Sequence, residues 1–599
     1  MHKINRNTFL AHSLKAGALV VLSPLSNPLF ADVMPGNAPN QVAKDDILRR
    51  LVLANDRQVA RLLPLINAGI PEAERMVGYY FAVLSAAYCS PGSEYYQGMP
   101  LIAPLEKLAK LLLDFQAEDG TLNLGVGNLE SPPDTAFLLD PLAAGVYLLE
   151  KQASAGLTPV KSDIKKFLLR AGEAMVTGGV HTPNHRWVVC AALARLNAVY
   201  PSKKYTDRIE DWLGEGVFID KDGHFPERSI NYALVEVEAL TIVGRLLNKP
   251  ALFEPVRKNL DLTWYYMDPD GSFTATDSRR QDQYSFKRTI LQYYLYYRYM
   301  AIRDNNSRYA GIATLIEQVK GFDEEILGRA LFHFLENPLL QESLPAGTPP
   351  PTDYEKLFTS SQLLRIRRGR NTTTLFGGVD WPLIIASGRS ANPNIFSYRK
   401  GNAVLKYLRI SSGFFNTGYF YSDGIRKDGS KYVLHKKLDV PYYQPLPQRL
   451  RKKDGDYKLS PSIDGRFWNK MDYSNRTVSN VKTLETTVVF AESNGENELT
   501  IQVSGQAGVP VTIELCFAAG GTLSGVTPAG DGNSFLEKGT GQYESGGDTI
   551  RFGPGTLAHK SITGLEGERY STHFGSLRTE GMHVYLTGMT PFEHKLVFG

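Results

Sequence analysis

A proline-rich segment near the middle of the chain, Leu344 to Asp353, divides the sequence into two stretches with different patterns. Its residues, LPAGTPPPTD, interrupt both helices and strands and are typical of a linker. With 599 residues the chain is also too long to fold around one hydrophobic core. We therefore predict two domains, at residues 32–343 and 355–599, joined by a linker at residues 344–354.

Before the linker, apolar residues recur at three- and four-residue spacing, as in amphipathic helices that end near Gly, Pro or Asn. The clearest segments are Glu74–Tyr88, Pro104–Gln116, Asp163–Val176, Trp187–Val199, Leu234–Leu246 and Tyr284–Ile302. Roughly a dozen such segments, paired across short loops, predict an (α/α)6 toroid of helical hairpins. A plain helical solenoid is the alternative, but no repeat consensus supports it.

After the linker, short runs of β-branched and aromatic residues alternate with Gly, Asn and Asp turns. The clearest runs are Ser361–Arg367, Thr372–Phe376, Ala403–Ile410, Thr486–Ala491, Leu499–Val503, Thr512–Phe517 and His583–Leu586. This pattern predicts an antiparallel β-sandwich. The expected fold class is therefore α+β and multidomain, with the toroid first and the sandwich second.

Composition argues against several classes of protein. The 66 Lys and Arg nearly balance the 62 Asp and Glu, and a net charge of +4 does not indicate a nucleic-acid partner. Cys89, Cys190 and Cys516 stand in apolar surroundings, which predicts buried free thiols rather than disulfides or metal ligands. We predict no cofactor and no metal. The 31 Tyr and 28 Phe suit a carbohydrate-binding surface, but a Tyr-rich β-domain core explains them equally well.

Residues 1–31 have the pattern of an export signal. Lys3 and Arg6 make the start basic, an apolar run covers Ala16–Leu22, and Leu29-Phe30-Ala31 resembles a cleavage site. The run is too short to span a bilayer. We expect an exported protein, with the periplasm as its compartment and no membrane insertion of the mature chain.

A first polar cluster, Asn184-His185-Arg186, stands directly before an apolar helix that begins at Trp187. A helix N-terminus presents unpaired N–H groups and partial positive charge, so anions bind there. Asn184 and a neighbouring cation are therefore candidates to hold a carboxylate. In the structural alternative, Asn184 only caps the helix and Arg186 is solvated.

A second polar cluster is Asp222–Tyr232, with the sequence D-G-H-F-P-E-R-S-I-N-Y. Asp-Gly predicts a turn and Ser229 a helix cap, so Tyr232 would lie in the first helical turn. A free Tyr titrates near ~10 and needs nearby cations or a helix terminus to act as a base. Three residues can supply this charge: Arg228, His185 and Arg279. In the alternative reading, Tyr232 is a packed core residue.

Two more polar loops precede helices. Arg279 and Arg280 could clamp a carboxylate in the forked geometry of guanidinium, or form a solvated salt-bridge face. Glu130 and Asp134 could bind sugar hydroxyls or only cap a helix. The predicted substrate-binding residues are Arg186, Arg228, Asn231, Arg279, Arg280, Glu130, Asp134 and His181. In the second domain, His435 and Trp468 are further candidates, although lone residues of these kinds are more often structural.

A helical toroid followed by a β-sandwich, with the motif D-G-x-F-x-E-x-S-x-x-Y at residues 222–232, resembles the heparinase II/III-like polysaccharide lyases. The resemblance implies that Tyr232 is catalytic and that Asn184 and His185 neutralise a uronate carboxylate. Specific similarity is confined to residues 184–187 and 222–232. The family often has a His directly after the Tyr, where this chain has Ala233, and the metal-binding His/Asp set of the β-domain is not evident.

Within that superfamily the chain also looks like the lyases that remove terminal rhamnose from glucuronic acid on arabinogalactan proteins. The resemblance implies β-elimination on an acidic oligo- or polysaccharide, with Tyr232 taking the C5 proton. Two alternatives remain open. A toroidal glycoside hydrolase would use a pair of carboxylates, drawn from Asp134, Glu130, Asp222 and Glu227. A non-catalytic glycan-binding protein would need no Tyr base.

Overall fold

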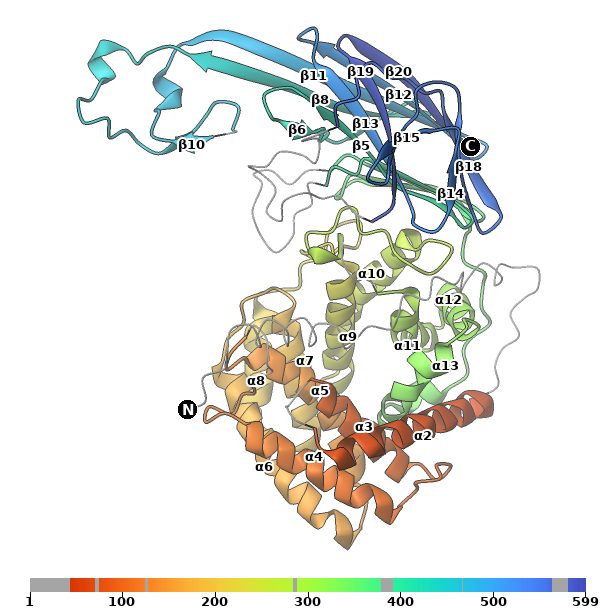
Figure 1. Cartoon of the computed structure of the whole chain (residues 1–599). Helices are drawn as coiled ribbons and strands as arrows, with labels where there is room; N and C mark the ends of the chain where they lie inside the picture. Colours follow the sequence, from red (N-terminus) through yellow and green to blue (C-terminus); the bar gives the residue numbers. More distant parts are fainter. Residues whose placement is uncertain are drawn as a thin grey trace. The chain divides into compact units, whose positions relative to one another are not determined.

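The computed structural model describes residues 44–70, 75–123, 128–283, 288–378, 392–465, 467–562 and 580–599 (Figure 1). The predicted signal sequence, residues 1–31, lies outside them. The chain forms two compact units: Met1–Thr274 with Lys287–Pro350, and Ala275–Phe286 with Pro351–Gly599. We call them the helical unit and the β unit. The predicted fold class is confirmed, because helices make up the first unit and antiparallel sheets the second.

The described residues of the helical unit form thirteen α-helices. Their bounds are α2 Lys44–Ala68, α3 Met76–Cys89, α4 Ile102–Phe115, α5 Pro132–Glu150, α6 Thr158–Thr177, α7 His185–Val199, α8 Lys203–Gly214, α9 Ile230–Leu246, α10 Phe253–Tyr266, α11 Tyr294–Asp304, α12 Ser307–Glu317, α13 Phe322–Glu325 and α14 Leu331–Glu336. None of the helices in this part of the chain combines the length and apolar composition needed to cross a membrane.

Alternate helices form two layers. Helices α3, α5, α7 and α9 pack side by side in that order, and α14 contacts both α3 and α5. Helices α4, α6 and α8 pack against one another in a second row. The sequence explains the division: α3 and α5 are apolar around most of their circumference, whereas α4 and α8 are strongly amphipathic. Helices of the first kind are buried on all sides, and those of the second kind have one face to solvent.

Glycine allows the closest of these helix contacts. A Cβ on Gly78 of α3 would lie 2.3 Å from the carbonyl oxygen of Leu138 on α5. A Cβ on Gly145 of α5 would lie 2.9 Å from Cα of Ala82 on α3. No real Cβ tolerates these distances, so the two glycines set how near the inner helices approach.

The β unit contains twenty strands among its described residues. They are β1 Asp353–Phe358, β2 Leu363–Arg368, β3 Asn371–Phe376, β4 Phe396–Lys400, β5 Ala403–Ser412, β6 Gly418–Tyr419, β7 Ile425–Asp428, β8 Lys431–Tyr443, β9 Ser460–Pro461, β10 Trp468–Asn469, β11 Val478–Ser493, β12 Glu496–Gly505, β13 Pro510–Phe517, β14 Thr522–Ser524, β15 Thr527–Gly530, β16 Asn533–Phe535, β17 Gly541–Ser545, β18 Asp548–Gly553, β19 Met582–Met589 and β20 Phe592–Phe598. Each of the seven predicted runs falls on a strand.

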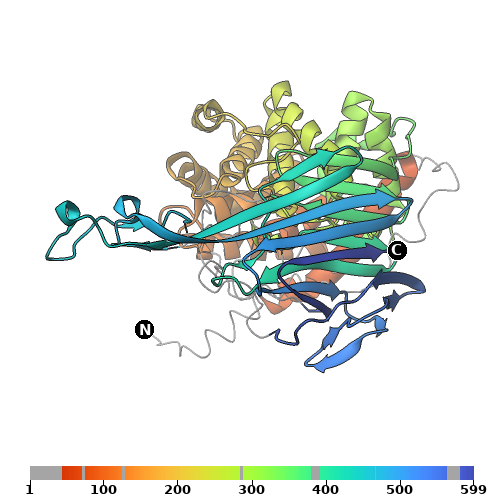
Figure 2. The ribbon, with the colours of Figure 1, turned by 90° about the horizontal axis from the view of Figure 1, so that it is seen from above.

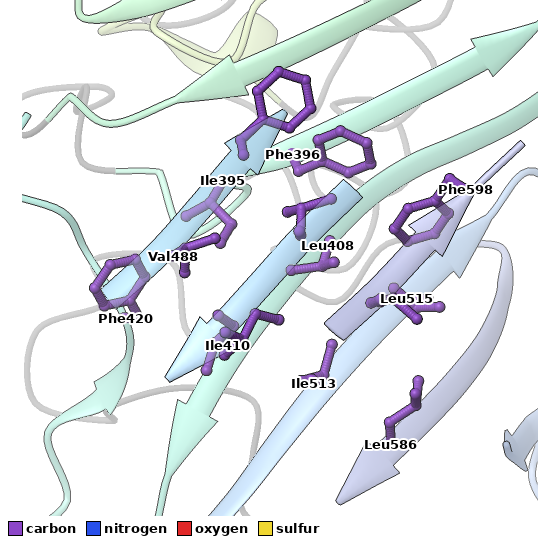
Figure 3. Close-up of a cluster of buried hydrophobic side chains, with 14 of the residues drawn as sticks. Ile395, Phe396, Leu408, Ile410, Phe420, Val488, Ile513, Leu515, Leu586 and Phe598 are labelled. Atoms are coloured by element: carbon purple, nitrogen blue, oxygen red, sulfur yellow. The ribbon is translucent and has the colours of Figure 1, made fainter. Parts of the chain in front are cut away.

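Two large sheets form a sandwich. One has the order β1-β2-β3-β4-β5-β13-β19-β16-β15, and the other the order β14-β17-β18-β20-β12-β11-β8-β7. All pairs within them are antiparallel except β16 with β19. Alternate residues of β13, such as Ile513 and Leu515, join Leu408 of β5, Val488 of β11 and Phe598 of β20 in one core (Figure 3). This period of two is the pattern of a strand with one face on a core.

Strands β8 and β11 are much longer than most of the others. They pair from Tyr432 with Phe490 as far as Tyr443 with Val478, and the register shifts between Val478 and Val481. The chain between them, which carries β9 and β10, extends beyond the sheet (Figures 1 and 2). We call residues 442–476 the distal lobe.

The helix expected at Tyr284–Ile302 begins later than predicted. Residues 284–287 lie outside the described part, a 3-10 turn covers Ile290–Tyr293, and α11 starts only at Tyr294. Thr289 and Gln292 form a capping box, with the backbone N–H of Thr289 donating to Oε1 of Gln292 at 2.8 Å. This local bond starts a new helical segment where apolar spacing alone predicts continuity.

The three cysteines are free thiols. Cys190 and Cys516 are buried, as predicted, whereas Cys89 at the end of α3 is partly exposed. Burial raises the pKa of the Cys89 thiol to about 12.

Candidate active site

The N-terminal ends of four inner helices carry the candidate site residues of the helical unit. Arg75 precedes α3, Asp134 lies in the first turn of α5, His185 begins α7, and Tyr232 lies in the first turn of α9. Contacts link each end to the next: Arg75 to Asp134, Phe137 of α5 to His185, and Asn184 to Glu227, just before α9. Helix N-termini carry partial positive charge, so their convergence suits a carboxylate ligand.

Asn184 is fully buried and does not cap its helix. Its Nδ2 donates to Oε2 of Glu227 at 2.5 Å, and its buried Oδ1 has no hydrogen-bond partner among the described residues. An amide nitrogen carries two hydrogens, so one N–H remains after the bond to Glu227. The structure therefore disagrees with the capping alternative and leaves one N–H and the Oδ1 of Asn184 unpaired among the described residues.

His185 contacts two other rings. Its ring meets Phe137 edge-on at 5.8 Å between centroids and His181 at 5.0 Å. His185 is 8% exposed, whereas His181 is exposed. These edge-to-face contacts favour one orientation of the imidazole, and a residue that transfers a proton needs a defined orientation.

Tyr232 is half-buried in the first turn of α9. Ser229 caps this helix as predicted, because its Oγ accepts from the backbone N–H of Tyr232 at 3.3 Å. Arg75 lies near enough to Tyr232 for their charges to interact. The structure thus brings a phenol, a guanidinium and a helix N-terminus together.

Arg75 is a site residue that the sequence did not reveal. It forms an ion pair with Asp134, and its guanidinium lies 4.4 Å from the ring centroid of Phe137. The second oxygen of Asp134 accepts from Nδ2 of Asn128 at 2.8 Å. The only sequence signal for Arg75 was its position at the start of the predicted helix Glu74–Tyr88, because its partner is 59 residues away.

Glu227 belongs to the same cluster, although the sequence placed it only in the hydrolase alternative. It is 7% exposed and holds Asn184 across 43 residues of sequence. The next residue, Arg228, has a φ of +50°, a left-handed conformation that residues with a Cβ rarely adopt. Strained backbone of this kind is concentrated at functional sites.

The turn that precedes Glu227 is structural. Oδ1 of Asp220 accepts from the backbone N–H groups of residues 222, 223 and 224, each at 2.9 Å. A Cβ on Gly223, where φ is +104°, would lie 2.4 Å from the carbonyl oxygen of Lys258. His224 is buried, with Nε2 2.9 Å from the hydroxyl of Tyr266. These contacts anchor the turn to α10 and so position the start of α9.

Several predicted residues have other contacts. Arg186 is not solvated: its Nη1 pairs with Glu215 at 2.7 Å and its guanidinium lies over Trp187. Oδ1 of Asn231 accepts from the backbone N–H of Arg288 at 2.8 Å. Glu130 is exposed on its loop.

Arg279 and Arg280 lie in the segment Ala275–Phe286, which belongs to the β unit. The cluster in the helical unit is therefore built without them. In the β unit, Nε2 of His435 lies 2.8 Å from Oε1 of Glu485 on the neighbouring strand, and Trp468 lies in the distal lobe.

A buried carboxyl, that of Glu236, lies near enough to Glu227 for their charges to interact. Glu236, one turn after Tyr232 on α9, is 1% exposed, and in the part of the chain that the structure describes its Oε2 has no hydrogen-bond partner. Burial, and then the charge of Glu227, raise the pKa of Glu236 well above its usual value, while Arg186 acts in the opposite direction. Burial therefore favours the protonated form of Glu236 over a wider pH range than in an exposed Glu.

The raised pKa predicts that Glu236→Gln stabilises the protein at high pH. A carboxyl with a raised folded pKa stabilises most below its ordinary pKa, and this contribution is lost as pH rises toward the folded value. Each pH unit in that interval costs about 1.4 kcal/mol, which a neutral Gln avoids. Thermal unfolding from pH 4 to pH 8 should show a gain that grows with pH. Glu118→Gln, at an exposed position, is the control; a gain independent of pH would contradict the prediction.

Buried ion pairs also join the inner helices α5, α7, α9 and α14 to one another. Arg195 of α7 pairs with Asp140 of α5 and, at 2.8 Å, with Glu336 of α14. Arg245 of α9 pairs with the other oxygen of Glu336 at 2.5 Å. Although burial acts against it, the two guanidiniums lower the pKa of Glu336 to about 2. Four inner helices are thus joined by charges in their interior.

In the described part of the chain, no group of three or more His, Cys, Asp or Glu is arranged to hold a metal ion. The site residues themselves are an amide, an imidazole, a phenol, guanidiniums and carboxylates. Such a set can bind an anionic sugar and move a proton.

No protein-family model and no curated protein sequence matches this chain. Solved structures do resemble it. Heparinase III aligns with 87% of this chain and 75% of its own, at 13% identity and a TM-score of 0.51. Streptomyces coelicolor chondroitin AC lyase in complex with chondroitin sulphate aligns with 95% of this chain and 81% of its own, at 12% identity and a TM-score of 0.50. Paenibacillus xanthan lyase aligns with 99% and 59%, at 11% identity and a TM-score of 0.52. At these identities the likeness shows that this chain shares their fold.

Proposed function

We propose that this protein is a polysaccharide lyase that cleaves a 4-linked uronic acid glycosidic bond by β-elimination. The observation that carries the proposal is the cluster around Tyr232, in which a phenol, an adjacent guanidinium and a buried Asn–His pair lie at converging helix N-termini. The likeness in fold to heparinase III and to chondroitin AC lyase supports it.

The reaction begins with the substrate carboxylate bound by Asn184 and His185. Hydrogen bonds to the carboxylate stabilise the negative charge that spreads onto it when the C5 proton leaves. Glu227 keeps the Asn184 amide in position through its bond to Nδ2. Without this neutralisation, a proton next to a carboxylate is too weakly acidic for a side chain to remove.

Tyr232, as the phenolate, takes the C5 proton. Arg75 and the N-terminus of α9 supply positive charge beside this side chain. The electron pair of the C5–H bond forms the C4–C5 double bond, and the C4–O bond breaks. The leaving oxygen takes a proton from Tyr232 or His185, and the product is a 4,5-unsaturated uronate.

Within this class, L-rhamnose-α-1,4-D-glucuronate at the ends of arabinogalactan side chains is the substrate that we propose to test first. Gum arabic supplies this linkage. The decisive measurement is ultraviolet absorbance during incubation with gum arabic and other acidic polysaccharides, because elimination creates a conjugated chromophore.

Each outcome of that screen has a meaning. New ultraviolet absorbance supports elimination. New reducing ends without new ultraviolet absorbance indicate hydrolysis. In that case the buried carboxyls Asp134 and Glu227 would act as the acid and base. Binding without any cleavage indicates a glycan-binding protein. Either of the last two results overturns the proposed lyase.

A further inference from the structure

The distal lobe, residues 442–476, is a folded element that the proposed reaction does not use. The rings of Tyr443 and Tyr473 lie 4.9 Å apart, and Tyr473 is buried. The hydroxyl of Tyr473 accepts from Nδ2 of Asn469 at 2.7 Å, and Nη1 of Arg476 donates to the carbonyl of Gln444 at 3.2 Å. The short pair β9 and β10 adds backbone bonds. These contacts give the lobe a defined surface.

That surface is unusually rich in exposed apolar side chains. Among the described residues, seventeen large hydrophobic side chains are exposed, and six of them lie in the lobe: Tyr442, Leu459, Ile463, Phe467, Trp468 and Met471. Trp468 is 67% exposed, whereas Trp187 and Trp264 of the helical unit are buried. Exposed apolar groups gathered in this way mark binding surfaces.

The lobe also carries the excess positive charge of the protein. Residues 442–476 contain eight Lys and Arg but four Asp, a net charge of +4, which equals the net charge of the whole chain. Arg449, Lys453 and Lys458 are exposed and form no ion pair with a described residue. A local excess of unpaired cations attracts polyanions.

We propose that the distal lobe is a second binding site for the acidic glycan, separate from the residues around Tyr232. Aromatic rings stack on the apolar faces of sugars, and unpaired cations attract the carboxylates of the same chain. Exposed Gln448, Ser474 and Asn475 add hydrogen-bonding groups for hydroxyls. The lobe would retain a polymer between cleavage events. The identity of the ligand rests on the proposed function.

Charge and polarity also argue against two other ligands of the lobe: a second copy of this chain and a lipid bilayer. Two copies of a lobe with net charge +4 repel each other, which disfavours lobe-to-lobe self-association. The exposed hydrogen-bonding amides and hydroxyl of the same lobe suit a sugar chain better than the apolar interior of a bilayer. Glycan binding uses both the rings and the cations.

The test is affinity electrophoresis of the full chain in native gels that contain gum arabic, with neutral dextran as the comparison. The charge variant replaces Arg449, Lys453 and Lys458 by Gln, and the aromatic variant is Trp468→Ala. We expect each to weaken retention by gum arabic about tenfold, and added salt to weaken that of the unmodified protein. Migration in dextran gels should not change. The matched control replaces three exposed cations outside the lobe, Arg61, Lys320 and Lys538, by Gln in the same way. It should retain full binding.

Kinetics provide a second readout. If the protein eliminates uronates, the charge variant should raise KM for gum arabic but leave kcat/KM for a short oligosaccharide unchanged. If the protein has no lyase activity, the electrophoresis still decides the question, so the two proposals fail separately.

Three results would overturn the proposed glycan site. The first is unchanged retention of both lobe variants. The second is a dimer in the unmodified protein that Trp468→Ala dissociates, as measured by sedimentation, because the lobe would then be a self-association surface. The third is lobe-dependent binding to phosphatidylglycerol vesicles without retention by gum arabic.

Discussion

Tyr232→Phe should abolish formation of the unsaturated product while the helical unit stays folded. Only the hydroxyl is lost, and the bond that caps α9 uses the backbone N–H of residue 232. Removing the group that transfers the proton should lower kcat by about 10³-fold, or about 4 kcal/mol in the activation barrier. Ultraviolet progress curves on gum arabic, or on whichever polysaccharide the screen identifies, measure this loss.

Tyr147→Phe is the matched control for this experiment. Tyr147 lies on α5 of the same helical unit and is also half-buried. We expect full activity from the control and an unchanged melting temperature for both variants. Substantial activity in Tyr232→Phe would show that another residue is the base and would end the assignment.

Arg195→Leu should lower the free energy of unfolding of the helical unit far more than a substitution at the surface does. The change leaves Asp140 and Glu336 buried without their shared cation, while Arg245 retains only one oxygen of Glu336. Removing one partner from a buried ion pair costs about 3–5 kcal/mol. Urea denaturation followed by circular dichroism measures the loss. The control, Arg49→Leu, removes an exposed pair with Asp46 and should cost less than about 1 kcal/mol.

The same variant has a pH signature. The folded pKa of Glu336 is depressed to about 2, so its stabilising contribution is complete above the ordinary value and is lost as pH falls through the folded value. Arg195→Leu removes one cause of the depression. The loss of stability between pH 4.5 and pH 2 should therefore be smaller in the variant than in the unmodified protein. Equal acid sensitivity would contradict the proposed role of the ion pair.

Local patterns in the sequence predicted the elements and two parts of the site. Apolar spacing located α3, α4, α6, α7 and α9, and runs of β-branched and aromatic residues located seven of the strands. Ser229 was identified as a cap and Tyr232 as a first-turn residue because both depend on bonds within four residues. The predicted start of the helix that contains α11 was wrong, because a capping box at Thr289 begins a new helical segment there.

Contacts between distant residues decided the rest. Arg75 meets Asp134, and Glu227 meets Asn184, only because the toroid sets the N-termini of neighbouring helices side by side. The sequence allowed Asn184 to be a helix cap, but its side chain bonds to Glu227 instead.

The sequence by itself determined that this protein has a helical part and a β part, and that Tyr232 stands at a helix N-terminus, because hydrophobic periodicity and capping act over one or two turns. Only the tertiary structure decided which charged side chains meet, which are buried and which are exposed: the Arg195 network, the buried Glu236 and the basic, aromatic distal lobe. Burial and charge pairing depend on distances in space that a linear pattern does not contain.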